Sequence, residues 1–247
     1  MKNYEFTDIH CHIIPQVDDG SDSIETSLRL ASMMYDDGIR RVITTPHFGI
    51  INPIYDPVRV AEQFELLSNE LSKIHPDMKL YRGNEIFISP GYSDGLDDRM
   101  SCTMADSNYV LVEFDESVDY DTLYHELRKL LLRGYSPILA HAERYMYAYR
   151  NVKQLASIVN QGVLIQINCN SICSLAERKS LFSVGHHEDK ILREMLAEGM
   201  VHFIATDCHD MPGREPHMTE AAKVMEGIIG EDRTREILEE NPKLIIC

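Results

Sequence analysis

Histidine and carboxylate side chains recur in short groups along the chain, and both types bind divalent metal ions. His10 and His12 lie two positions apart, and so do Asp207 and His209. Residues two apart on a β-strand point to the same side, so each pair can converge on one ion, whereas the cysteine between them should point away. Further groups are Thr45-Pro46-His47, Gly83-Asn84-Glu85, Val112-Glu113-Phe114 and Ala140-His141-Ala142-Glu143-Arg144, and Asp18-Asp19-Gly20 forms a turn.

The number of these side chains is stronger evidence for a metal site than any single motif, because a lone His-x-His pair arises easily by chance in a chain with 11 histidines. Five of the histidines and four of the acidic residues are candidate ligands. This mixed set of nitrogen and oxygen donors fits Mn²⁺, Fe²⁺ or Zn²⁺, and the many carboxylates disfavour a purely thiolate site. Nine ligands exceed the needs of one ion. Two or three ions, bridged by a carboxylate and a hydroxide, would account for them, and such centres commonly hydrolyse phosphate esters.

The segments that carry these groups read as strands alternating with helices. Apolar runs predict strands at residues 6–10, 41–45, 79–88, 109–114, 136–140, 163–168 and 200–206. Helical spacing of apolar residues predicts helices at residues 24–35, 57–74, 120–133, 151–160 and 188–198. Asp56-Pro57 is typical of a helix start, and Asp37-Gly38 of a helix end. The candidate ligands therefore fall at the ends of nearly all the predicted strands.

Alternating strands and helices predict a parallel sheet with right-handed crossovers. Seven such units in 247 residues can nearly close into a barrel, so we expect one α/β domain over residues 1–247 with a seven-stranded (β/α)7 barrel. An open doubly wound sheet is the competing architecture. Both folds place their chemistry at the carboxyl ends of the strands, where the candidate ligands fall. The helices after Pro216 are interpreted as a C-terminal lid or packing element.

Composition limits the classes of molecule that the protein is expected to bind and the compartment in which it is expected. The formal net charge is -16, so the chain should not attract nucleic acid, and any phosphate that it binds must be held by local cations. The sequence has neither a signal peptide pattern nor a long uninterrupted apolar run, so we expect a cytoplasmic protein without membrane insertion. Six irregularly placed cysteines in such a protein are expected to be reduced thiols.

Taken in order and spacing, the motifs resemble those of the polymerase and histidinol phosphatase (PHP) family. Within that family they look like the bacterial metal-dependent protein-tyrosine phosphatases of capsule and exopolysaccharide operons, and the resemblance spans almost the whole chain. It includes Gln166-Ile167-Asn168 and the late Asn241-Pro242. The resemblance implies a distorted seven-stranded barrel and two or three divalent ions, with Mn²⁺ preferred and Fe²⁺, Co²⁺ or Zn²⁺ as alternatives. The ligands that it implies are His10, His12, Asp19, His47, Glu85, Glu113, His141, Asp207 and His209, with Glu85 as the bridging carboxylate.

The function expected on these grounds is hydrolysis of phosphotyrosine monoesters by a metal-bridging hydroxide. Arg144 and Arg214 follow candidate ligands closely, and a guanidinium can hold two phosphate oxygens, so we expect both to bind the phosphoryl group. The alternative for each arginine is a surface salt bridge. The resemblance alone implies the substrate protein, which is the phosphorylated tyrosine-rich tail of a bacterial tyrosine autokinase.

Three other interpretations remain open at this point. The same metal site would suit a small-molecule phosphatase such as a histidinol-phosphate phosphatase, and residues 48–55 and 90–105 would decide between these substrates. A non-catalytic scaffold barrel with structural metals is a second alternative. The third is a thiol phosphatase, because Cys208 and Arg214 have Cys-x5-Arg spacing. That chemistry needs a thiolate favoured by a nearby cation, whereas Asp207 precedes the cysteine and disfavours the thiolate.

Overall fold

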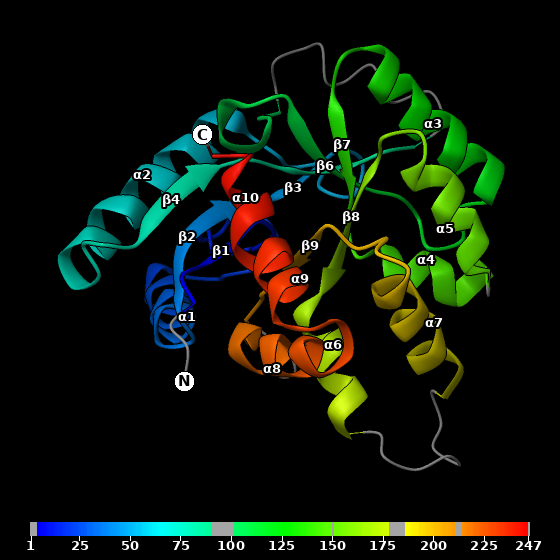
Figure 1. The fold of residues 1–247 in the computed structure, drawn as a ribbon. Helices are drawn as coiled ribbons and strands as arrows, with labels where there is room; N and C mark the ends of the chain where they lie inside the picture. The colour runs from blue at the N-terminus through cyan, green and yellow to red at the C-terminus, as the bar shows by residue number, and fades with distance from the viewer. Residues whose placement is uncertain (1–3, 90–100, 150, 178–185, 211–213, 247) are drawn as a thin grey trace.

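The computed structural model describes residues 4–89, 101–149, 151–177, 186–210 and 214–246, and within them every pairing between strands is parallel. The strands form the inner layer, and helices surround them (Figure 1). The strands are β1 (Phe6–Asp8), β2 (Ile39–Thr44), β3 (His47–Phe48), β4 (Lys79–Arg82), β5 (Glu85–Phe87), β6 (Tyr109–Glu113), β7 (Ser136–Leu139), β8 (Leu164–Asn168) and β9 (Phe203–Ala205). The predicted α/β architecture with a parallel sheet is therefore confirmed.

These strands are divided between two sheets. One has the order β1-β2-β4, and the other has the order β3-β5-β6-β7-β8-β9. Just beyond β1 and β9 the chain pairs again, through a parallel bridge between Cys11 and Cys208. The Asp207 amide donates to the His10 carbonyl over 2.8 Å, and the His12 amide donates to the Cys208 carbonyl over 3.1 Å. These bonds join the two sheets, so that the parallel strands curl around one centre.

The predicted barrel of seven continuous strands is not observed. Residues 79–88, predicted as one strand, form β4 and β5, and the pair Gly83-Asn84 separates them. The second strand is likewise followed by the short β3 after Pro46. Proline has no amide hydrogen, so Pro46 supplies no donor at the point where β2 has ended. The Pro46 carbonyl instead accepts from the Asn84 side chain over 2.9 Å and from the Glu85 amide over 3.3 Å. The chain thus leaves one sheet and enters the other at these two places.

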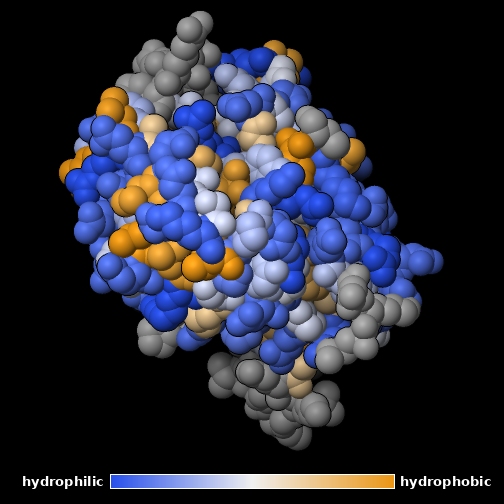
Figure 2. Space-filling model, turned by 90° about the vertical axis from the view of Figure 1, so that its left-hand side faces the viewer, coloured by the Kyte–Doolittle hydropathy of each residue, from blue (hydrophilic) through white to orange (hydrophobic). Residues whose placement is uncertain are grey.

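Five helices lie close to their predicted bounds, namely α1 (Ile24–Asp36), α2 (Pro57–Ile74), α3 (Tyr120–Leu132), α5 (Val152–Val159) and α7 (His186–Ala197). Side chains cap four of them at the N-terminus, as at α2, where the Asp56 carboxylate accepts from the Val58 amide. Each buries one apolar stripe in the interior, such as Leu30 and Met34 of α1. The side of the molecule that carries α1 and α2 is mainly hydrophilic, with apolar side chains in separate patches (Figure 2).

The remaining helices were either not predicted or only loosely placed. Neither α4 (Ala142–Tyr149) nor α6 (Cys169–Glu177) was predicted, and each starts within three residues of a strand end. The C-terminal segment forms α8 (Met218–Ile229), α9 (Glu231–Arg235), the π-helical turn η3 (Glu236–Glu240) and α10 (Asn241–Lys243). Glu239 accepts from the Glu5 amide, and Asn241 donates to the His202 carbonyl. Both contacts lie before β1 and β9 begin, so this segment is a packing element at the opposite end from the candidate ligands.

Within the part of the chain that the structure describes, no helix is both long enough and apolar enough to span a membrane.

Candidate metal centre

All nine side chains predicted as ligands lie together where the two sheets meet. His10 and His12 follow β1, and Asp207 and His209 follow β9. The others come from neighbouring strand ends or starts: Asp19 precedes α1, His47 begins β3, Glu85 begins β5, Glu113 ends β6 and His141 follows β7. His47 and Glu85 occupy strand starts because β3 and β5 continue the chain beyond β2 and β4. The predicted clustering is confirmed, and the binding of metal by these residues stays a prediction.

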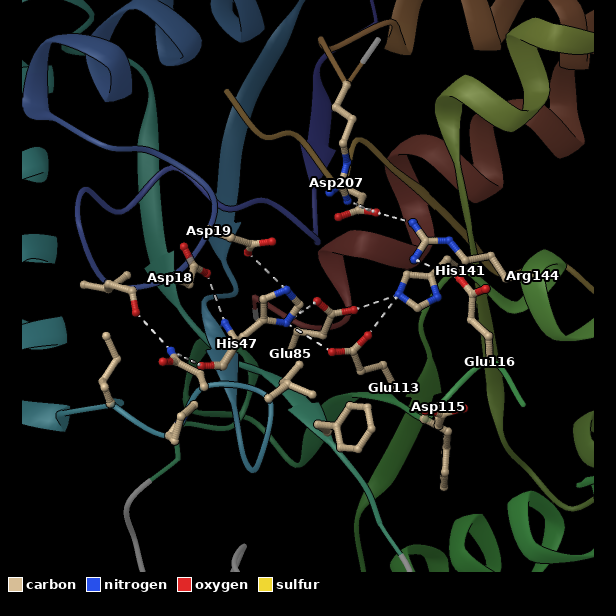
Figure 3. A pocket seen from close by; sticks show the side chains of 18 of the residues that line it. Asp18, Asp19, His47, Glu85, Glu113, Asp115, Glu116, His141, Arg144 and Asp207 are labelled. Atoms are coloured by element: carbon tan, nitrogen blue, oxygen red, sulfur yellow. Dashed lines mark hydrogen bonds and ion pairs between the residues drawn. The ribbon is translucent and has the colours of Figure 1, made fainter. Parts of the chain in front are cut away.

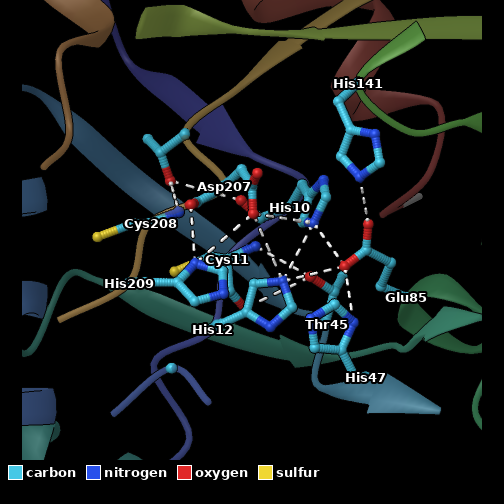
Figure 4. A network of polar contacts seen from close by, with 12 residues as sticks. His10, Cys11, His12, Thr45, His47, Glu85, His141, Asp207, Cys208 and His209 are labelled. Carbon is cyan, nitrogen blue, oxygen red and sulfur yellow. Dashed lines mark hydrogen bonds and ion pairs between the residues drawn. The ribbon is translucent and has the colours of Figure 1, made fainter. Parts of the chain in front are cut away.

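The Glu85 carboxylate lies at the centre of the cluster, where it contacts four imidazole rings (Figure 4). Its Oε2 atom lies 3.1 Å from His10 Nε2, 3.2 Å from His12 Nε2 and 3.1 Å from His47 Nδ1. Its Oε1 atom lies 2.9 Å from His141 Nε2. Only 1% of Glu85 is exposed. Burial raises the pKa of this carboxyl, but the surrounding histidines hold it well below its usual range. A carboxylate shared in this way is suited to bridge two ions.

Two further carboxylates extend the cluster on either side of Glu85. Asp19 Oδ1 lies 3.4 Å from His47 Nε2 and 3.5 Å from His209 Nε2. Glu113 lies 3.1 Å from His47 Nδ1 through one oxygen and 3.5 Å from His141 Nε2 through the other. Among the residues that the structure describes, three groups of side chains are compact enough to hold an ion each: His12, Asp19, His47 and His209; His10, His12 and Glu85; and His47, Glu85 and Glu113. Because these groups share members, they suit a centre with more than one ion.

Two side chains that the sequence analysis did not assign fix the histidine rings. His12 Nδ1 lies 2.8 Å from Asp18 Oδ2, and His10 Nδ1 lies 3.1 Å from Gln166 Oε1. Both partners are acceptors, since Gln166 Oε1 also accepts the His141 amide and its Nε2 donates to Asn168. Each Nδ1 must therefore carry the hydrogen. Such outer partners orient metal ligands in many proteins, and they follow the ligands in space rather than in sequence.

This hydrogen-bonding pattern tests whether the residues fit a cation. In the neutral form of each ring, with hydrogen on Nδ1, the Nε2 atoms of His10 and His12 would present lone pairs to each other over 3.1 Å and to Glu85 Oε2. Electron pairs that face one another repel unless a positive charge lies between them. Among the described residues, buried His47 Nδ1, His209 Nε2 and Glu113 Oε1 form no well-aligned hydrogen bond, although each lies 3.1–3.5 Å from an oppositely charged group of the cluster. The donor set therefore fits divalent ions.

The electrostatics of the cluster favour positive charge in the same place. Burial alone lowers the pKa of His47, but the Glu113 and Glu85 carboxylates raise it to about 10. The same two carboxylates outweigh burial at His141 and raise its pKa to about 9. The carboxylates thus create a strongly negative environment that either protons or metal ions can neutralise.

Local backbone conformation contributes to this arrangement. His141 and Asp207 have φ values of 34° and 50°, in the left-handed region that costs about 1–3 kcal/mol for a residue other than glycine. The turn that carries Asp19 packs tightly against His12, because a Cβ atom at Gly20 would lie 2.1 Å from the His12 carbonyl oxygen. Glycine is therefore required at that position.

The two arginines predicted to bind phosphate both lie at the cluster and contact Asp207. Arg144 Nη2 lies 3.0 Å and Arg214 Nη2 lies 2.6 Å from Asp207 Oδ2, and the Asn168 amide donates to the same oxygen over 2.8 Å. The other oxygen of Asp207 faces His10 over 3.5 Å. Asp207 therefore links Arg144 and Arg214 to the histidine cluster. The sequence does not indicate this link.

The cysteines beside the paired ligands point away from the centre, as predicted (Figure 4). Cys11 and Cys208 are completely buried in the hydrophobic core. Burial raises the pKa of the Cys11 thiol well above its ordinary value. Residues 211–213 of the Cys-x5-Arg segment lie outside the described residues.

A cavity of about 840 Å³ opens onto the cluster (Figure 3). Its polar wall includes Asp19, His47, Glu85, Glu113, His141, Arg144, Asp207 and Arg214. Pockets for small ligands have volumes of roughly 300–1,000 Å³, so the cavity can hold more than a phosphate. Of the two segments expected to determine the substrate, residues 48–55 contribute to this cavity, whereas residues 90–100 lie outside the described residues.

Comparison with known proteins gives consistent matches over almost the full chain. Residues 6–247 match the family model for capsular polysaccharide synthesis, CpsB/CapC. The chain is 28% identical over 242 residues to tyrosine-protein phosphatase CpsB of Streptococcus agalactiae, covering 97% of each protein. It is 31% identical over 245 residues to tyrosine-protein phosphatase YwqE of Bacillus subtilis, covering 97% of this chain and 91% of the relative.

Solved structures agree with these matches. One belongs to a study of YwqE from Bacillus subtilis and CpsB from Streptococcus pneumoniae, described as unique metal-dependent tyrosine phosphatases. It has a TM-score of 0.84 and 30% identity, and the match covers 97% of this chain and 94% of that one. The phosphotriesterase homology protein from Escherichia coli has a TM-score of 0.64 at 10% identity, with complete coverage of both chains. That second likeness concerns the fold alone.

Proposed function

Because the chain belongs to the CpsB/CapC family of capsular polysaccharide synthesis proteins, we propose that it is a metal-dependent tyrosine-protein phosphatase. This family membership confirms the resemblance of its motifs. The observation that carries the proposal is the shared Glu85 carboxylate, with four imidazole rings around it and two arginines at the same cavity.

In the proposed centre, the nine clustered side chains would hold two or three divalent ions, preferably Mn²⁺, and Glu85 would be the carboxylate that they share. Bound ions supply Lewis acidity, which lowers the pKa of water and draws charge from phosphoryl oxygens. Asp18 and Gln166 keep the hydrogens of His12 and His10 on Nδ1, so that each Nε2 stays free to donate its electron pair. The metal preference rests on the mixed nitrogen and oxygen donors.

The arginines are proposed to bind the substrate's phosphoryl group. Both guanidiniums line the cavity, and both are held near the cluster by one oxygen of Asp207. A phosphoryl group that enters the cavity offers them additional anionic oxygens. Water then forms a bond to phosphorus while the bond from phosphorus to the tyrosine oxygen breaks; the water gives up a proton to solvent, and the released phenolate takes one up from solvent. Since a phenol has a pKa near ~10, its phenolate leaves without a strong general acid, and we assign none.

The proposed physiological substrate is the phosphorylated tyrosine-rich tail of a bacterial tyrosine autokinase, in the cytoplasm. Support for this part comes from the family's description as capsular polysaccharide synthesis proteins and from the sequence resemblance. The two relatives compared here are named tyrosine-protein phosphatases, which favours a phosphoprotein over a small-molecule substrate.

A comparison of three substrates tests the proposed function. Metal-loaded protein should hydrolyse a phosphotyrosine peptide with a higher kcat/KM than a phosphoserine peptide or histidinol phosphate. The release of inorganic phosphate from each substrate measures this preference. A higher kcat/KM for histidinol phosphate would favour the small-molecule alternative, and no turnover of any substrate would favour the scaffold.

Replacing Cys208 with serine separates the metal mechanism from a thiol mechanism. The thiol is fully buried in the core and points away from the cavity, so it has no access to substrate. We expect kcat/KM for the phosphotyrosine peptide to fall by no more than about threefold, with a modest loss of stability from the buried hydroxyl. Steady-state kinetics and thermal melting measure the two effects. A folded, metal-loaded variant without activity would support a thiol nucleophile instead.

Replacing Arg144 or Arg214 with alanine should reduce kcat/KM by about one to two orders of magnitude. A charge-assisted bond to phosphate contributes roughly 1.5–3 kcal/mol, and 1.4 kcal/mol corresponds to about tenfold in rate. Metal content should persist, because the other arginine and Asn168 still hold Asp207. Lysine should restore the activity only partly, since it supplies the charge without the planar fork.

Kinetics and metal analysis on the same samples check this prediction. Arg29, which pairs with Asp210 outside the cavity lining, is a matched control whose alanine variant should keep normal kcat/KM. Near-normal kcat/KM in both the Arg144→Ala and Arg214→Ala variants would refute phosphate binding by these side chains.

A further inference from the structure

The cavity at the cluster has an apolar side that binding of phosphate does not explain. Within the part of the chain that the structure describes, we group five of the apolar residues that line it, Val17, Ile51, Pro53, Ile54 and Phe87, as the apolar wall. Divalent ions and phosphate need polar partners, so apolar side chains gathered beside them imply a ligand with an apolar part.

The apolar wall lies beside the cluster, because its members line the same cavity as the candidate ligands Glu85 and His47. Phe87 and Glu85 are two apart on β5, so their side chains share one side of the strand. Ile51 lies four residues after His47 in the chain. A group bonded to the phosphate through one oxygen atom would therefore reach this wall.

Two members of the apolar wall are unusually exposed for large aliphatic side chains. Ile51 is 43% exposed and Ile54 is 81% exposed. Single apolar residues on a surface are ordinary, but these two line one cavity together with buried Phe87. Their exposure in the ligand-free protein leaves apolar area that a bound group can cover.

The segment that carries Ile51 and Ile54 is tied to the metal centre. The Asn52 side chain donates to the Val17 carbonyl over 2.9 Å and to the His47 carbonyl over 3.0 Å. Gly49 has φ 118°, and a Cβ atom there would lie 3.0 Å from the Phe87 carbonyl oxygen. These contacts fix the segment relative to His47, so the wall keeps a constant position beside the site of the phosphate.

We propose that the apolar wall binds the aromatic ring of phosphotyrosine and thereby selects aryl phosphates over alkyl phosphates. This inference rests on the proposed phosphatase function and assigns substrate selection to Ile51 and Ile54. An aromatic ring is flat, large and apolar, and it attaches directly to the phosphate oxygen. The alkyl chain of phosphoserine is too short to cover the same surface.

Phosphonates are not hydrolysed by a phosphatase, so their affinity reports binding alone. Their binding therefore measures recognition of the ring without any contribution from the leaving group. Isothermal titration calorimetry on metal-loaded protein would compare phenylphosphonate with methylphosphonate. We expect phenylphosphonate to bind about tenfold more tightly, which corresponds to about 1.4 kcal/mol. The Ile51→Ser, Ile54→Ser double variant should lose this preference and keep its affinity for methylphosphonate.

Two further variants make the result unambiguous. Ile50 is 57% exposed in the same segment but does not line the cavity, so Ile50→Ser should keep the preference. The single Ile54→Ser variant changes a side chain too exposed to affect folding, and it should lose part of the preference. Equal binding of both phosphonates by the unaltered protein, or a preference that survives in the double variant, would overturn the inference. Either result alongside normal hydrolysis of phosphotyrosine peptide would leave the proposed function intact.

Discussion

The Glu85→Ala variant is expected to lose metal and to lower kcat/KM for a phosphotyrosine peptide by about 10³-fold or more, which corresponds to about 4 kcal/mol. The physical reason is that one carboxylate contacts four imidazole rings and belongs to two of the three compact ligand groups. Removing it leaves those rings without their shared anion. His209→Ala should cause a comparable loss, because His209 belongs to the remaining group.

Histidines outside the cluster supply the controls for this prediction. His75 stacks on Tyr35 with ring centroids 4.0 Å apart, and His125 lies against Tyr124. Alanine at either position should leave metal content and kcat/KM essentially unchanged. Metal analysis by mass spectrometry and steady-state kinetics on all four variants would test this difference in metal content and kcat/KM. Equal damage from His75→Ala, His125→Ala and Glu85→Ala would mean that the centre has been assigned to the wrong residues.

Removal of the metal is the second change with a large expected effect. Protein freed of metal with EDTA should have no measurable phosphatase activity, and Mn²⁺, Co²⁺ or Fe²⁺ should restore it. The nucleophile in the proposed reaction is water, which is too weakly acidic without a Lewis acid to react at neutral pH. No side chain is assigned to replace it.

The Glu85→Ala variant is the matched control for restoration by metal. Its activity should not return when Mn²⁺ is added, which would show that the ions act at this centre. Phosphate release before and after addition of each metal is the measurement. Full activity in protein shown to be free of metal would contradict the proposal.

The cluster could be predicted from the sequence because its signal is largely local. Paired ligands two apart in His10-Cys11-His12 and Asp207-Cys208-His209 indicate one shared side of the chain, and the structure brings both pairs together. Helices with strong caps were predicted for the same reason. Asp56 ahead of Pro57 marks the start of α2, because a carboxylate there accepts a free backbone amide.

Features that depend on contacts between distant residues could not be predicted in the same way. The division of residues 79–88 into β4 and β5 depends on Asn84 and Glu85 bonding to Pro46, 38 residues away from Asn84. The role of Gln166 depends on His10, which lies 156 residues away. Neither pairing leaves a periodic pattern in the sequence.

Two local patterns, the tyrosines after Arg144 and the two arginines, can be interpreted only when the fold is known. Tyr145 begins an alternation of tyrosines after Arg144, a pattern that does not show whether these side chains line a cleft or pack in the core. The segment is instead the helix α4, and Tyr145 is fully buried with its hydroxyl donating to the Phe114 carbonyl. Arg144 and Arg214 are predicted to bind phosphate, but their contact with Asp207 arises because the start of α4 lies beside the segment that follows β9.

Anomalous diffraction from crystals grown with Mn²⁺ would test the central claim most directly, because it locates each ion independently of activity. The account predicts two or three peaks within coordination distance of nitrogen or oxygen atoms of the nine clustered side chains. At least two of these peaks should share the Glu85 carboxylate. A single peak away from Glu85, or no peak in crystals of protein that hydrolyses phosphotyrosine peptide, would contradict it.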